Sequence, residues 1–100
     1  MNGAVVDLKR LKQLKARYNL RIVEDAAQVL GALDRNFLAP GTCDIGGAIS
    51  FYPAKVLGSL GDGGAIITND PDFYAYCIAA RNHGLDEYGR CRILGRNSRM

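Results

Sequence analysis

The sequence lacks most of the features that would place it in a special class of protein. No apolar run approaches the roughly 18 residues that a membrane-spanning helix needs. The first residues also lack the charged-then-apolar layout of a signal peptide, so a cytoplasmic location is the default expectation. Internal repeats, low-complexity tracts and domain linkers are missing too. A chain of 100 residues, 48% hydrophobic and 23% charged, suits one small globular domain.

Cysteine and histidine are too scarce to suggest a disulfide set or a metal centre. The three cysteines, Cys43, Cys77 and Cys91, are odd in number and lie far apart, which argues against paired disulfides or a Cys-x-x-Cys site. Reduced, structural thiols are the expectation. His83 is the only histidine and cannot support a metal site by itself, so we expect it to be structural or near a substrate.

The net charge of +3 is modest, but the basic residues form two clusters. Six lie between Lys9 and Arg21, and five arginines lie between Arg81 and Arg99. The second cluster could suggest a nucleic-acid patch. The chain has no zinc-finger spacing, no aromatic-rich RNA-recognition motif and no helix-turn-helix, whereas anionic small molecules or a partner subunit would also account for exposed arginines. We therefore expect no nucleic-acid partner and no membrane partner.

The first part of the chain predicts a helix followed by a strand. Apolar residues recur at the spacing of one helical face: Leu8, Leu11, Leu14 and Tyr18. Asp7 is the expected N-cap, and Asn19 can close the helix. Residues 20–25 then predict a short strand that ends in two acidic residues. A helix followed by a strand ending in a carboxylate is typical of an open α/β sheet, where ligands collect at the carboxyl ends of the strands.

Two further strands and a second helix are predicted downstream. Residues 26–46 are expected to hold a small helical turn and then a loop. Residues 47–51 and 65–68 predict strands, and these should be antiparallel because no crossover helix separates them. A capping Asn-Asp pair and Pro71 predict a helix over about residues 71–82.

Lys55, the only lysine after position 15, stands between the last two predicted strands. Its segment passes Pro53 and reaches a glycine-dense turn at Gly61–Gly64, which rules out a continuous helix. A lysine on such a loop could meet a bound ligand. Taken alone, a surface lysine on a hairpin loop is the simpler interpretation.

Three separated segments together resemble one family. They are Val23–Ala32, which contains Glu-Asp-Ala-Ala-Gln, then Ser50–Gly58 with Gly61–Gly64, and finally Asn82–Gly84 followed by Gly95–Met100. In order and spacing they resemble the DegT/DnrJ-type sugar aminotransferases, pyridoxal-phosphate enzymes of the aspartate-aminotransferase fold (fold type I). The resemblance covers nearly the whole chain. It implies an α/β fold, as part of a large cofactor-binding domain with a mixed, mainly parallel sheet flanked by helices.

The resemblance also implies roles for five residues. Asp25 would pair with the ring nitrogen of pyridoxal 5'-phosphate, and Gln28 would lie against the ring and its phenolic oxygen. Ser50 would contact the cofactor phosphate, and Lys55 would form the internal Schiff base. Asn97 would reach the phosphate site of the neighbouring subunit. Lys55 and Asp25 are therefore the expected catalytic residues.

The chemistry of these residue types supports the roles independently. A carboxylate beside a pyridine nitrogen favours the protonated ring, which is a better sink for the electrons released when the substrate's Cα–H bond breaks. Asp25 at a strand end suits this task. The amine of Lys55 can attack a carbonyl only as its free base, which burial beside cationic or apolar groups favours. Once displaced by the incoming amine, the same lysine is placed to move a proton between Cα and the C4′ carbon of the cofactor.

Each residue also has a simpler interpretation. Asp25 could cap the following turn, Ser50 could be a satisfied core hydroxyl, and Gly61–Gly64 could be a plain hairpin turn that needs positive φ. For any one of them the simpler interpretation is favoured. Asp25, Gln28, Ser50 and Lys55 together, at these spacings, favour the cofactor.

The sequence departs from the family pattern in two ways. Leu30 stands where the family often has histidine, and Ser98 where it often has tyrosine, which leaves the choice of substrate open. Family members also run to several hundred residues. We therefore expect residues 1–100 to be part of the large domain, with the N-terminal segment and the C-terminal small domain of the family absent.

The expected function is transamination of a nucleotide-linked keto sugar, with the amino group taken from glutamate or glutamine, by a longer homodimeric enzyme. The clustered arginines would suit the substrate phosphates or the dimer interface. A second hypothesis is that the isolated chain is a non-catalytic fragment or interaction module, because three strands taken from a larger sheet leave unpaired edges. A third, sugar dehydration with the same cofactor, is disfavoured by Lys55, since histidine replaces the lysine in the known variants of that kind.

Overall fold

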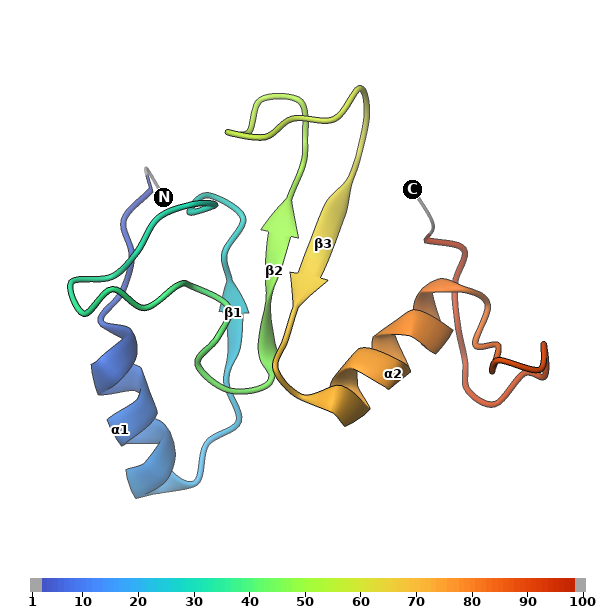
Figure 1. Ribbon diagram of the computed structural model, residues 1–100, viewed down its shortest axis with the longest axis horizontal. Helices are drawn as coiled ribbons and strands as arrows, with labels where there is room; N and C mark the ends of the chain where they lie inside the picture. The colour runs from blue at the N-terminus through green and yellow to red at the C-terminus, as the bar shows by residue number, and fades with distance from the viewer. Residues whose placement is uncertain (1–2, 99–100) are drawn as a thin grey trace. The chain divides into compact units, whose positions relative to one another are not determined.

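In the computed structural model, the chain forms two compact units, Met1–Asn69 and Asp70–Met100 (Figure 1). The structure describes residues 3–98. Arg99 and Met100, the last two residues of the Gly95–Met100 motif, lie outside the described residues. Arg99 is also one of the five arginines of the second basic cluster. None of the helices in the described part is long and apolar enough to cross a membrane.

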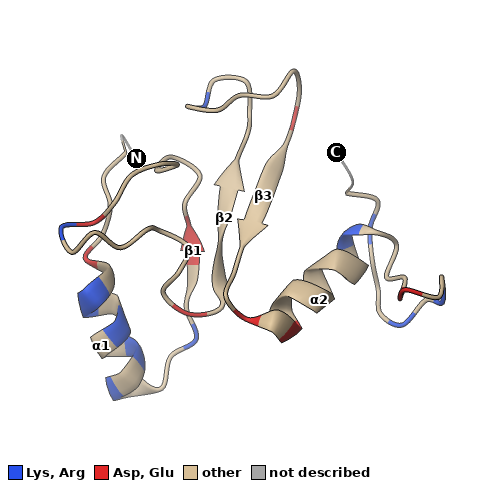
Figure 2. Ribbon diagram, in the orientation of Figure 1, with Lys and Arg blue, Asp and Glu red and all other residues tan. Residues whose placement is uncertain are grey.

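Helix α1 (Leu8–Tyr18) begins and ends where its capping residues predict. The Asp7 carboxylate accepts a hydrogen bond from a backbone N–H of the first turn, which would otherwise lack a partner. Asn19 adopts the left-handed conformation (φ 50°), and its N–H donates to a carbonyl of the last turn. Lysine and arginine occupy much of the helix surface (Figure 2). Leu8 is fully buried, but Tyr18 is 57% exposed, so the buried face is shorter than the apolar pattern predicts.

Three strands form one mixed sheet in the order β1-β2-β3. Strand β1 (Val23–Asp25) pairs in parallel with β2 (Gly46–Ser50), and β2 pairs antiparallel with β3 (Gly64–Ile67). The expected α/β class and the expected antiparallel second pair are both confirmed. The parallel first pair places the carboxyl ends of β1 and β2 at one edge of the sheet (Figure 1).

Strand β1 starts later than the strand predicted from Leu20, because the preceding N–H groups are bonded elsewhere. The N–H of Leu20 donates to α1, and the N–H of Ile22 donates to the Asp44 carboxylate at 2.8 Å. Asp44 also forms a 2.6 Å salt bridge with Lys15 of α1. The hydrogen bond from Lys15 is the main reason that the pKa of Asp44 is lowered. One carboxylate thus ties the end of α1 to the start of β1.

The connection between the two parallel strands is irregular. Residues 26–32 make two successive turns, closed by hydrogen bonds from Val29 N to Ala26 O (3.2 Å) and from Ala32 N to Val29 O (3.0 Å). The expected helical turn is therefore present only as these two turns. A loop follows, as predicted, and runs to the start of β2.

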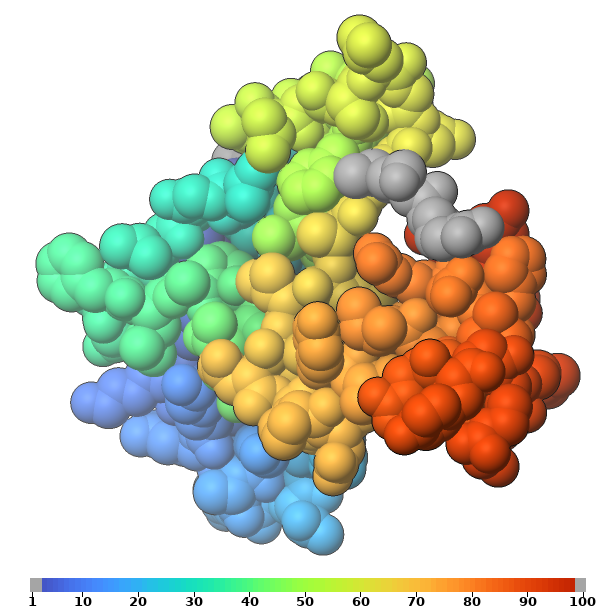
Figure 3. Space-filling model, turned by 45° about the vertical axis from the view of Figure 1, so that its right-hand side comes forward, coloured from blue at the N-terminus to red at the C-terminus, as the bar shows by residue number. Residues whose placement is uncertain are grey.

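Asp34 organises this loop from a buried position. Its carboxylate accepts hydrogen bonds from the backbone N–H groups of Leu8 (3.1 Å), Asn36 (2.7 Å) and Leu38 (2.9 Å). Burial alone would raise the pKa of Asp34, but these hydrogen bonds, together with one from the Asn36 side-chain amide (3.1 Å), lower it to about 2. The bond to Leu8 connects the loop to the first turn of α1, and the space-filling view shows the loop lying against that helix (Figure 3).

One face of the sheet is covered by the loop, and the other is exposed. On the covered face the buried Glu24 accepts a 2.7 Å hydrogen bond from the N–H of Cys43. Gly47 lies so close to Gly41 that an added Cβ would stand 2.6 Å from the Gly41 Cα. The other face, which we call the open face, carries the side chains of five residues in the register: Val23, Asp25, Ala48, Ser50 and Ile66. Its apolar members Val23 and Ile66 remain 66% and 55% exposed.

Helix α2 (Pro71–Arg81) also begins where its cap predicts. Asp70 accepts hydrogen bonds from the N–H groups of Asp72 (3.0 Å) and Phe73 (2.9 Å), and Pro71 occupies the first turn. The predicted end at residue 82 is one position beyond the observed end. This helix starts the second unit.

Beyond α2 the chain crosses itself at two glycines. The N–H of His83 donates to the carbonyl of Arg96 at 3.0 Å. A Cβ on Gly84, which has φ 77°, would stand 1.9 Å from the carbonyl oxygen of Ile93. A Cβ on Gly95 would stand 1.9 Å from the backbone nitrogen of Gly84. Only glycine at both positions allows the two backbone segments to approach this closely. We call this contact between Gly84 and Gly95 the glycine crossing.

Candidate functional site

Four of the predicted site residues lie at or beyond the carboxyl ends of β1 and β2. Asp25 is the last residue of β1 and Ser50 the last residue of β2. The register pairs Asp25 with Ala48, and Ser50 follows Ala48 on the same side of the strand, so both polar residues belong to the open face. Gln28 lies in the turn after β1. Lys55 lies in the loop after β2, which extends beyond this edge of the sheet (Figure 1).

One oxygen of the Asp25 carboxylate accepts a hydrogen bond, and the other oxygen is not used by the described residues. Its Oδ1 accepts from the N–H of Ala27 at 3.0 Å, so the carboxylate does cap the following turn. The residue is exposed, and Oδ2 has no protein partner within residues 3–98. The cap therefore fixes the carboxylate while leaving one oxygen for a cationic group.

Ser50 and Gln28 retain hydrogen-bonding capacity at the same edge. The Oγ of Ser50 accepts from the N–H of Tyr52 at 3.2 Å. Its hydroxyl hydrogen is thus available to donate to an anionic oxygen. Gln28 is exposed, and its side-chain amide makes no hydrogen bond to any other residue that the structure describes.

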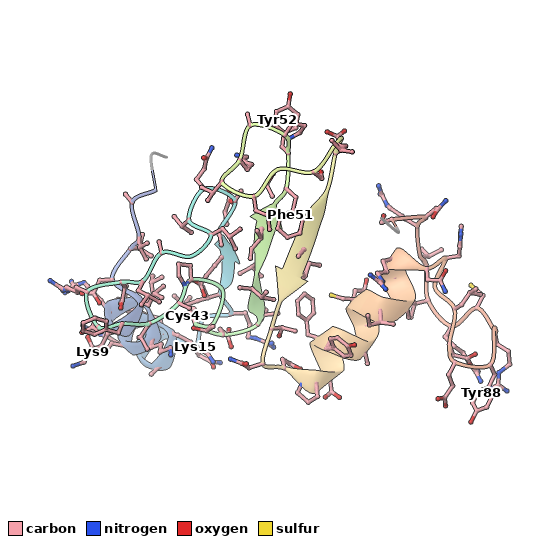
Figure 4. The ribbon with its side chains drawn as sticks, turned by 45° about the horizontal axis from the view of Figure 1, so that its top comes forward. Lys9, Lys15, Cys43, Phe51, Tyr52 and Tyr88 are labelled. Atoms are coloured by element: carbon pink, nitrogen blue, oxygen red, sulfur yellow. The ribbon has the colours of Figure 1, made fainter. Side chains whose placement is uncertain are left out.

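The loop that carries Lys55 is closed on itself. The backbone N–H and the hydroxyl of Ser59 both donate to the carbonyl of Phe51 at 2.8 Å. The N–H of Lys55 donates to the carbonyl of Tyr52 at 2.9 Å, which forms a turn. Tyr52 points outward at the tip of the loop, and Phe51 lies nearer the strands (Figure 4). Lys55 is half-buried, and its amine forms no ion pair with the described part of the chain.

Sequence reasoning found this lysine but missed two residues that shape its loop. Ser59 closes the loop through Phe51, and Gly58 allows close approach to Pro53, because an added Cβ at Gly58 would stand 2.5 Å from the Pro53 carbonyl oxygen. The available signal was a Gly-Ser pair that follows a Tyr-Pro turn within a few residues. Small residues at that position allow two backbone segments to meet.

The fifth predicted residue, Asn97, belongs to the second unit. It is exposed, and it pairs with Asn82 at the end of α2. The N–H groups on either side, from Arg96 and Ser98, donate to α2 carbonyls at 2.7 and 2.9 Å. The backbone of Asn97 is thereby fixed relative to α2. His83 takes a structural position at the glycine crossing, with φ 57°.

All three cysteines are free. Burial raises the pKa of Cys43 and of Cys77, so both thiols stay protonated at neutral pH and are poor nucleophiles. Cys91 is exposed. Reduced thiols stay a prediction, and Cys43 alone of the three is buried.

The four residues at the sheet edge form a set of complementary groups. Asp25 offers a carboxylate oxygen, Ser50 a hydroxyl donor, Gln28 a neutral amide and Lys55 a primary amine. This set fits a flat cationic ring that carries an anionic phosphate and an aldehyde. The donor chemistry is therefore compatible with pyridoxal phosphate.

Comparisons with known proteins identify relatives over the whole chain. The profile of the DegT/DnrJ/EryC1/StrS aminotransferase family matches residues 1–100. A dTDP-3-amino-3,4,6-trideoxy-alpha-D-glucose transaminase of Micromonospora megalomicea subsp. nigra is 44% identical over 99 residues, which cover 98% of this chain and 26% of that protein. A UDP-N-acetyl-3-dehydro-alpha-D-glucosamine 3-aminotransferase of Acidithiobacillus ferrooxidans is 36% identical, with coverage of 98% and 26%.

Solved structures show the same similarity. S. venezuelae DesV, solved in complex with a ketimine intermediate, superposes with a TM-score of 0.89 at 39% identity, covering 100% of this chain and 27% of that one. NtdA from Bacillus subtilis, solved with bound cofactor PMP, superposes with a TM-score of 0.81 at 31% identity, covering 100% and 22%. The chain thus spans about a quarter of the length of the relatives that it matches.

Proposed function

Because the chain belongs to the DegT/DnrJ/EryC1/StrS aminotransferase family, whose members depend on pyridoxal phosphate, we propose that it is part of the large domain of a longer sugar aminotransferase. The complete enzyme would move an amino group from glutamate or glutamine onto a keto group of a nucleotide-linked sugar. Relatives named as dTDP-sugar and UDP-sugar aminotransferases support this substrate class. The observation that carries the proposal is the placement of Asp25 and Ser50 on one sheet face, at the edge from which the Lys55 loop extends.

Three residues would hold and tune the cofactor. Pyridoxal phosphate supplies, when bound, an electron sink conjugated to the reacting carbon. Asp25 would keep the proton on the ring nitrogen through Oδ2, since a nearby carboxylate favours the charged ring. Ser50 would donate its hydroxyl hydrogen to a phosphate oxygen, and Gln28 would orient the ring through its amide.

Lys55 would carry two tasks. Its amine would attach the cofactor to the protein. Once the amino donor displaces it, the free amine would take the proton from the donor Cα and release a proton to the adjacent cofactor carbon. In the second half of the reaction the proton would move the other way, onto the sugar carbon. The compact loop around Lys55 would limit where the amine can reach.

Borohydride reduction of the complete enzyme, followed by peptide mapping, tests the role of Lys55. We expect the cofactor label on Lys55 alone, and a label on any other lysine refutes the assignment. Lys15 provides a matched control because its amine is engaged by Asp44. Lys15→Arg should leave the cofactor absorbance unchanged, whereas Lys55→Arg should abolish covalent attachment.

Substitution of Asp25 tests the electrostatic part of the proposal. Asp25→Asn retains an oxygen for the Ala27 N–H but removes the charge. We expect the cofactor to bind while transamination falls by roughly 100-fold or more. Asp62→Asn, which removes an exposed carboxylate from the loop after β2, is the control and should leave activity unchanged. Equal activities of the two variants would contradict the role of Asp25.

We also propose that the complete enzyme is a cytoplasmic homodimer in which Asn97 reaches the cofactor phosphate of the neighbouring subunit. The exposure of Asn97 on a fixed backbone supports the shared site, and the free cysteines support the location. Mixing subunits with Lys55→Ala and subunits with Asn97→Ala should restore about a quarter of the intact sites, because each mixed dimer would regain one complete site. If Asn97 acts within its own subunit, mixing restores nothing.

A second candidate concerns the 100-residue chain by itself: a non-catalytic fragment or interaction module. The outer edge of β1 has no partner strand in the described sheet, and the open face exposes Val23 and Ile66. The buried apolar side chains of the described chain are Leu8, Ala26 and Cys43, a small core. Both observations favour a chain that needs further segments or partners to be stable.

A further inference from the structure

The loop after α2 carries an aromatic ring and two arginines that the proposed mechanism does not use. Residues 85–91 form a tight hairpin, closed by the bridge between Leu85 and Cys91. The N–H of Asp86 donates to the carbonyl of Arg90 at 2.9 Å, and Gly89 turns the chain with φ 75°. The hairpin therefore has a defined backbone.

Asp86 fixes both the backbone and the arginine side chains of this hairpin. Its Oδ1 accepts from the N–H groups of Tyr88 and Arg90, each at 2.9 Å. Its Oδ2 accepts from the Nε atoms of Arg90 (3.1 Å) and Arg92 (3.0 Å). The N–H of Arg90, foremost, and the guanidinium groups lower the pKa of Asp86, so the carboxylate stays charged at neutral pH. Two guanidinium groups are thus held next to each other on one oxygen.

The arginine pair carries more positive charge than the one carboxylate that it contacts. A single carboxylate neutralises one of the two guanidinium groups, and both side chains are more than half exposed (59% and 57%). Each arginine uses only Nε toward Asp86, and within residues 3–98 the terminal NH₂ groups of Arg90 and Arg92 have no hydrogen-bond partner. The planar fork of a guanidinium matches the spacing of phosphate oxygens.

Tyr88 adds an aromatic surface beside this charge. The guanidinium carbon of Arg90 lies 4.9 Å from the centre of the Tyr88 ring, yet Tyr88 remains 72% exposed. Its side chain points outward at the end of the hairpin (Figure 4). An exposed aromatic ring offers a face on which a nucleobase can stack, because every base has a π-face.

We propose that Tyr88, Arg90 and Arg92 bind the nucleoside diphosphate portion of the sugar substrate. Arg90 and Arg92 would contact the two phosphoryl groups, and Tyr88 would stack on the base. The inference rests on the proposed function for the substrate being a nucleotide-linked sugar. Inorganic diphosphate would use the arginines alone, whereas a nucleoside diphosphate would use the arginines and the ring.

Calorimetric titration of the cofactor-loaded complete enzyme with dTDP and with inorganic diphosphate tests the proposal. Replacing both arginines by alanine should weaken binding of each ligand by roughly 10- to 100-fold. Tyr88→Leu should weaken binding of dTDP only. Arg17 and Tyr18 are the matched control, because the Arg17 guanidinium lies 5.1 Å from the Tyr18 ring but forms no ion pair with a carboxylate within residues 3–98. Replacing this pair should not change binding.

A double lysine variant and a hydrogen-exchange measurement distinguish loss of the binding groups from unfolding of the hairpin. Arg90→Lys together with Arg92→Lys keeps both charges but removes the guanidinium forks, so diphosphate binding should fall less than with alanine. Hydrogen exchange at the N–H of Arg92, which donates to the carbonyl of Gly84 at 2.9 Å, reports whether the hairpin remains folded. Unchanged dTDP binding by the alanine pair overturns the proposal.

The two proposals fail in distinguishable ways. A wild-type enzyme that carries its cofactor on Lys55 but binds dTDP no better than inorganic diphosphate overturns the nucleotide site and leaves transamination standing. If the complete enzyme never attaches the cofactor, the same titration is made without it, and dTDP binding that depends on Tyr88 and the arginines then supports the nucleotide site and overturns the proposed reaction. Equal losses of dTDP and diphosphate binding in Tyr88→Leu overturn the stacking role.

Discussion

Three single glycine substitutions after α2 separate the energetic cost of backbone strain from that of steric overlap. Gly84 and Gly95 form the glycine crossing, and Gly89 lies in the hairpin between them. Gly89→Ala introduces strain alone, because Gly89 has φ 75° and an added Cβ would meet nothing within 4 Å. Gly95→Ala introduces overlap alone, because its Cβ would stand 1.9 Å from the nitrogen of Gly84 and its φ lies outside the left-handed region. Gly84→Ala combines φ 77° with a Cβ placed 1.9 Å from a carbonyl oxygen.

The expected costs follow from these geometries. A left-handed alanine at Gly89 costs about 1–2 kcal/mol. The overlap at Gly95 involves backbone atoms that cannot rotate away, so relieving it should cost about 1–3 kcal/mol. Gly84 carries both terms, and we expect about 2–5 kcal/mol. Gly84→Ala should therefore be the most destabilising of the three variants, because it alone combines backbone strain with steric overlap.

Hydrogen exchange of the complete enzyme, read by mass spectrometry, measures these local costs. The N–H groups of Arg96 and Ser98 donate to α2 carbonyls and are exposed to exchange only when the crossing opens. Each 1.4 kcal/mol speeds exchange about tenfold, so Gly84→Ala should accelerate both amides by roughly 30-fold or more. Peptides from α1 serve as the internal control. Exchange in Gly84→Ala no faster than in Gly89→Ala would refute the account of the crossing.

Three further outcomes are expected. The pKa of Asp34 is about 2 in the folded chain against an ordinary 3.8, so its contribution to stability is present above pH 3.8 and lost as the pH falls toward 2. Asp34→Asn should flatten the acid limb of Tm against pH, and an unchanged slope would contradict this. Leu8→Ala should lower the free energy of unfolding in urea by about 2–5 kcal/mol, because Leu8 is fully buried. Leu94→Ala is the control: Leu94 is 97% exposed, so its replacement should change the free energy of unfolding by less than about 0.5 kcal/mol. Similar losses for both would remove Leu8 from the core. The isolated chain should elute as aggregates in size-exclusion chromatography, and Val23→Lys at the unpaired β1 edge should reduce them. A monodisperse, cooperatively unfolding monomer of the unmodified chain would count against that expectation.

The helices were predictable because their signals are local. Asp7 and Asn19 bracket α1, and the Asp70-Pro71 pair starts α2, each acting on backbone groups within one turn. Strands β2 and β3 were found within a few residues for a similar reason, since glycine and proline bound them. Tyr18 shows the limit of the pattern, because helical spacing does not say how far a neighbouring segment extends along the helix.

The residues that fix the loops were not predictable, because their partners are remote in sequence. Asp34 bonds to Leu8, 26 positions away, and Asp44 bonds to Ile22, 22 positions away. In the sequence each looks like an ordinary loop carboxylate. The late start of β1 follows directly from the Asp44 contact.

The candidate site was predictable in its placement but not in its supports. The edge position of Asp25 and Ser50 follows from two parallel strands, and the family resemblance selected these residues from many polar ones. Their roles toward the cofactor stay predictions. The closure of the lysine loop by Ser59 and the crossing at Gly84 depend on which backbone segments meet in space, which no local pattern states.

The pairing register has a consequence for refolding from denaturant. Ser50 pairs with Gly64 across the loop after β2, whereas Asp25 pairs with Ala48 across a longer irregular stretch. Closing the shorter stretch loses less chain entropy, and an antiparallel hairpin can zip from its own turn. We therefore expect the β2–β3 hairpin with Lys55 to form before β1 joins it, so that Lys55 and Asp25, the proposed catalytic residues, come together only after the hairpin has formed.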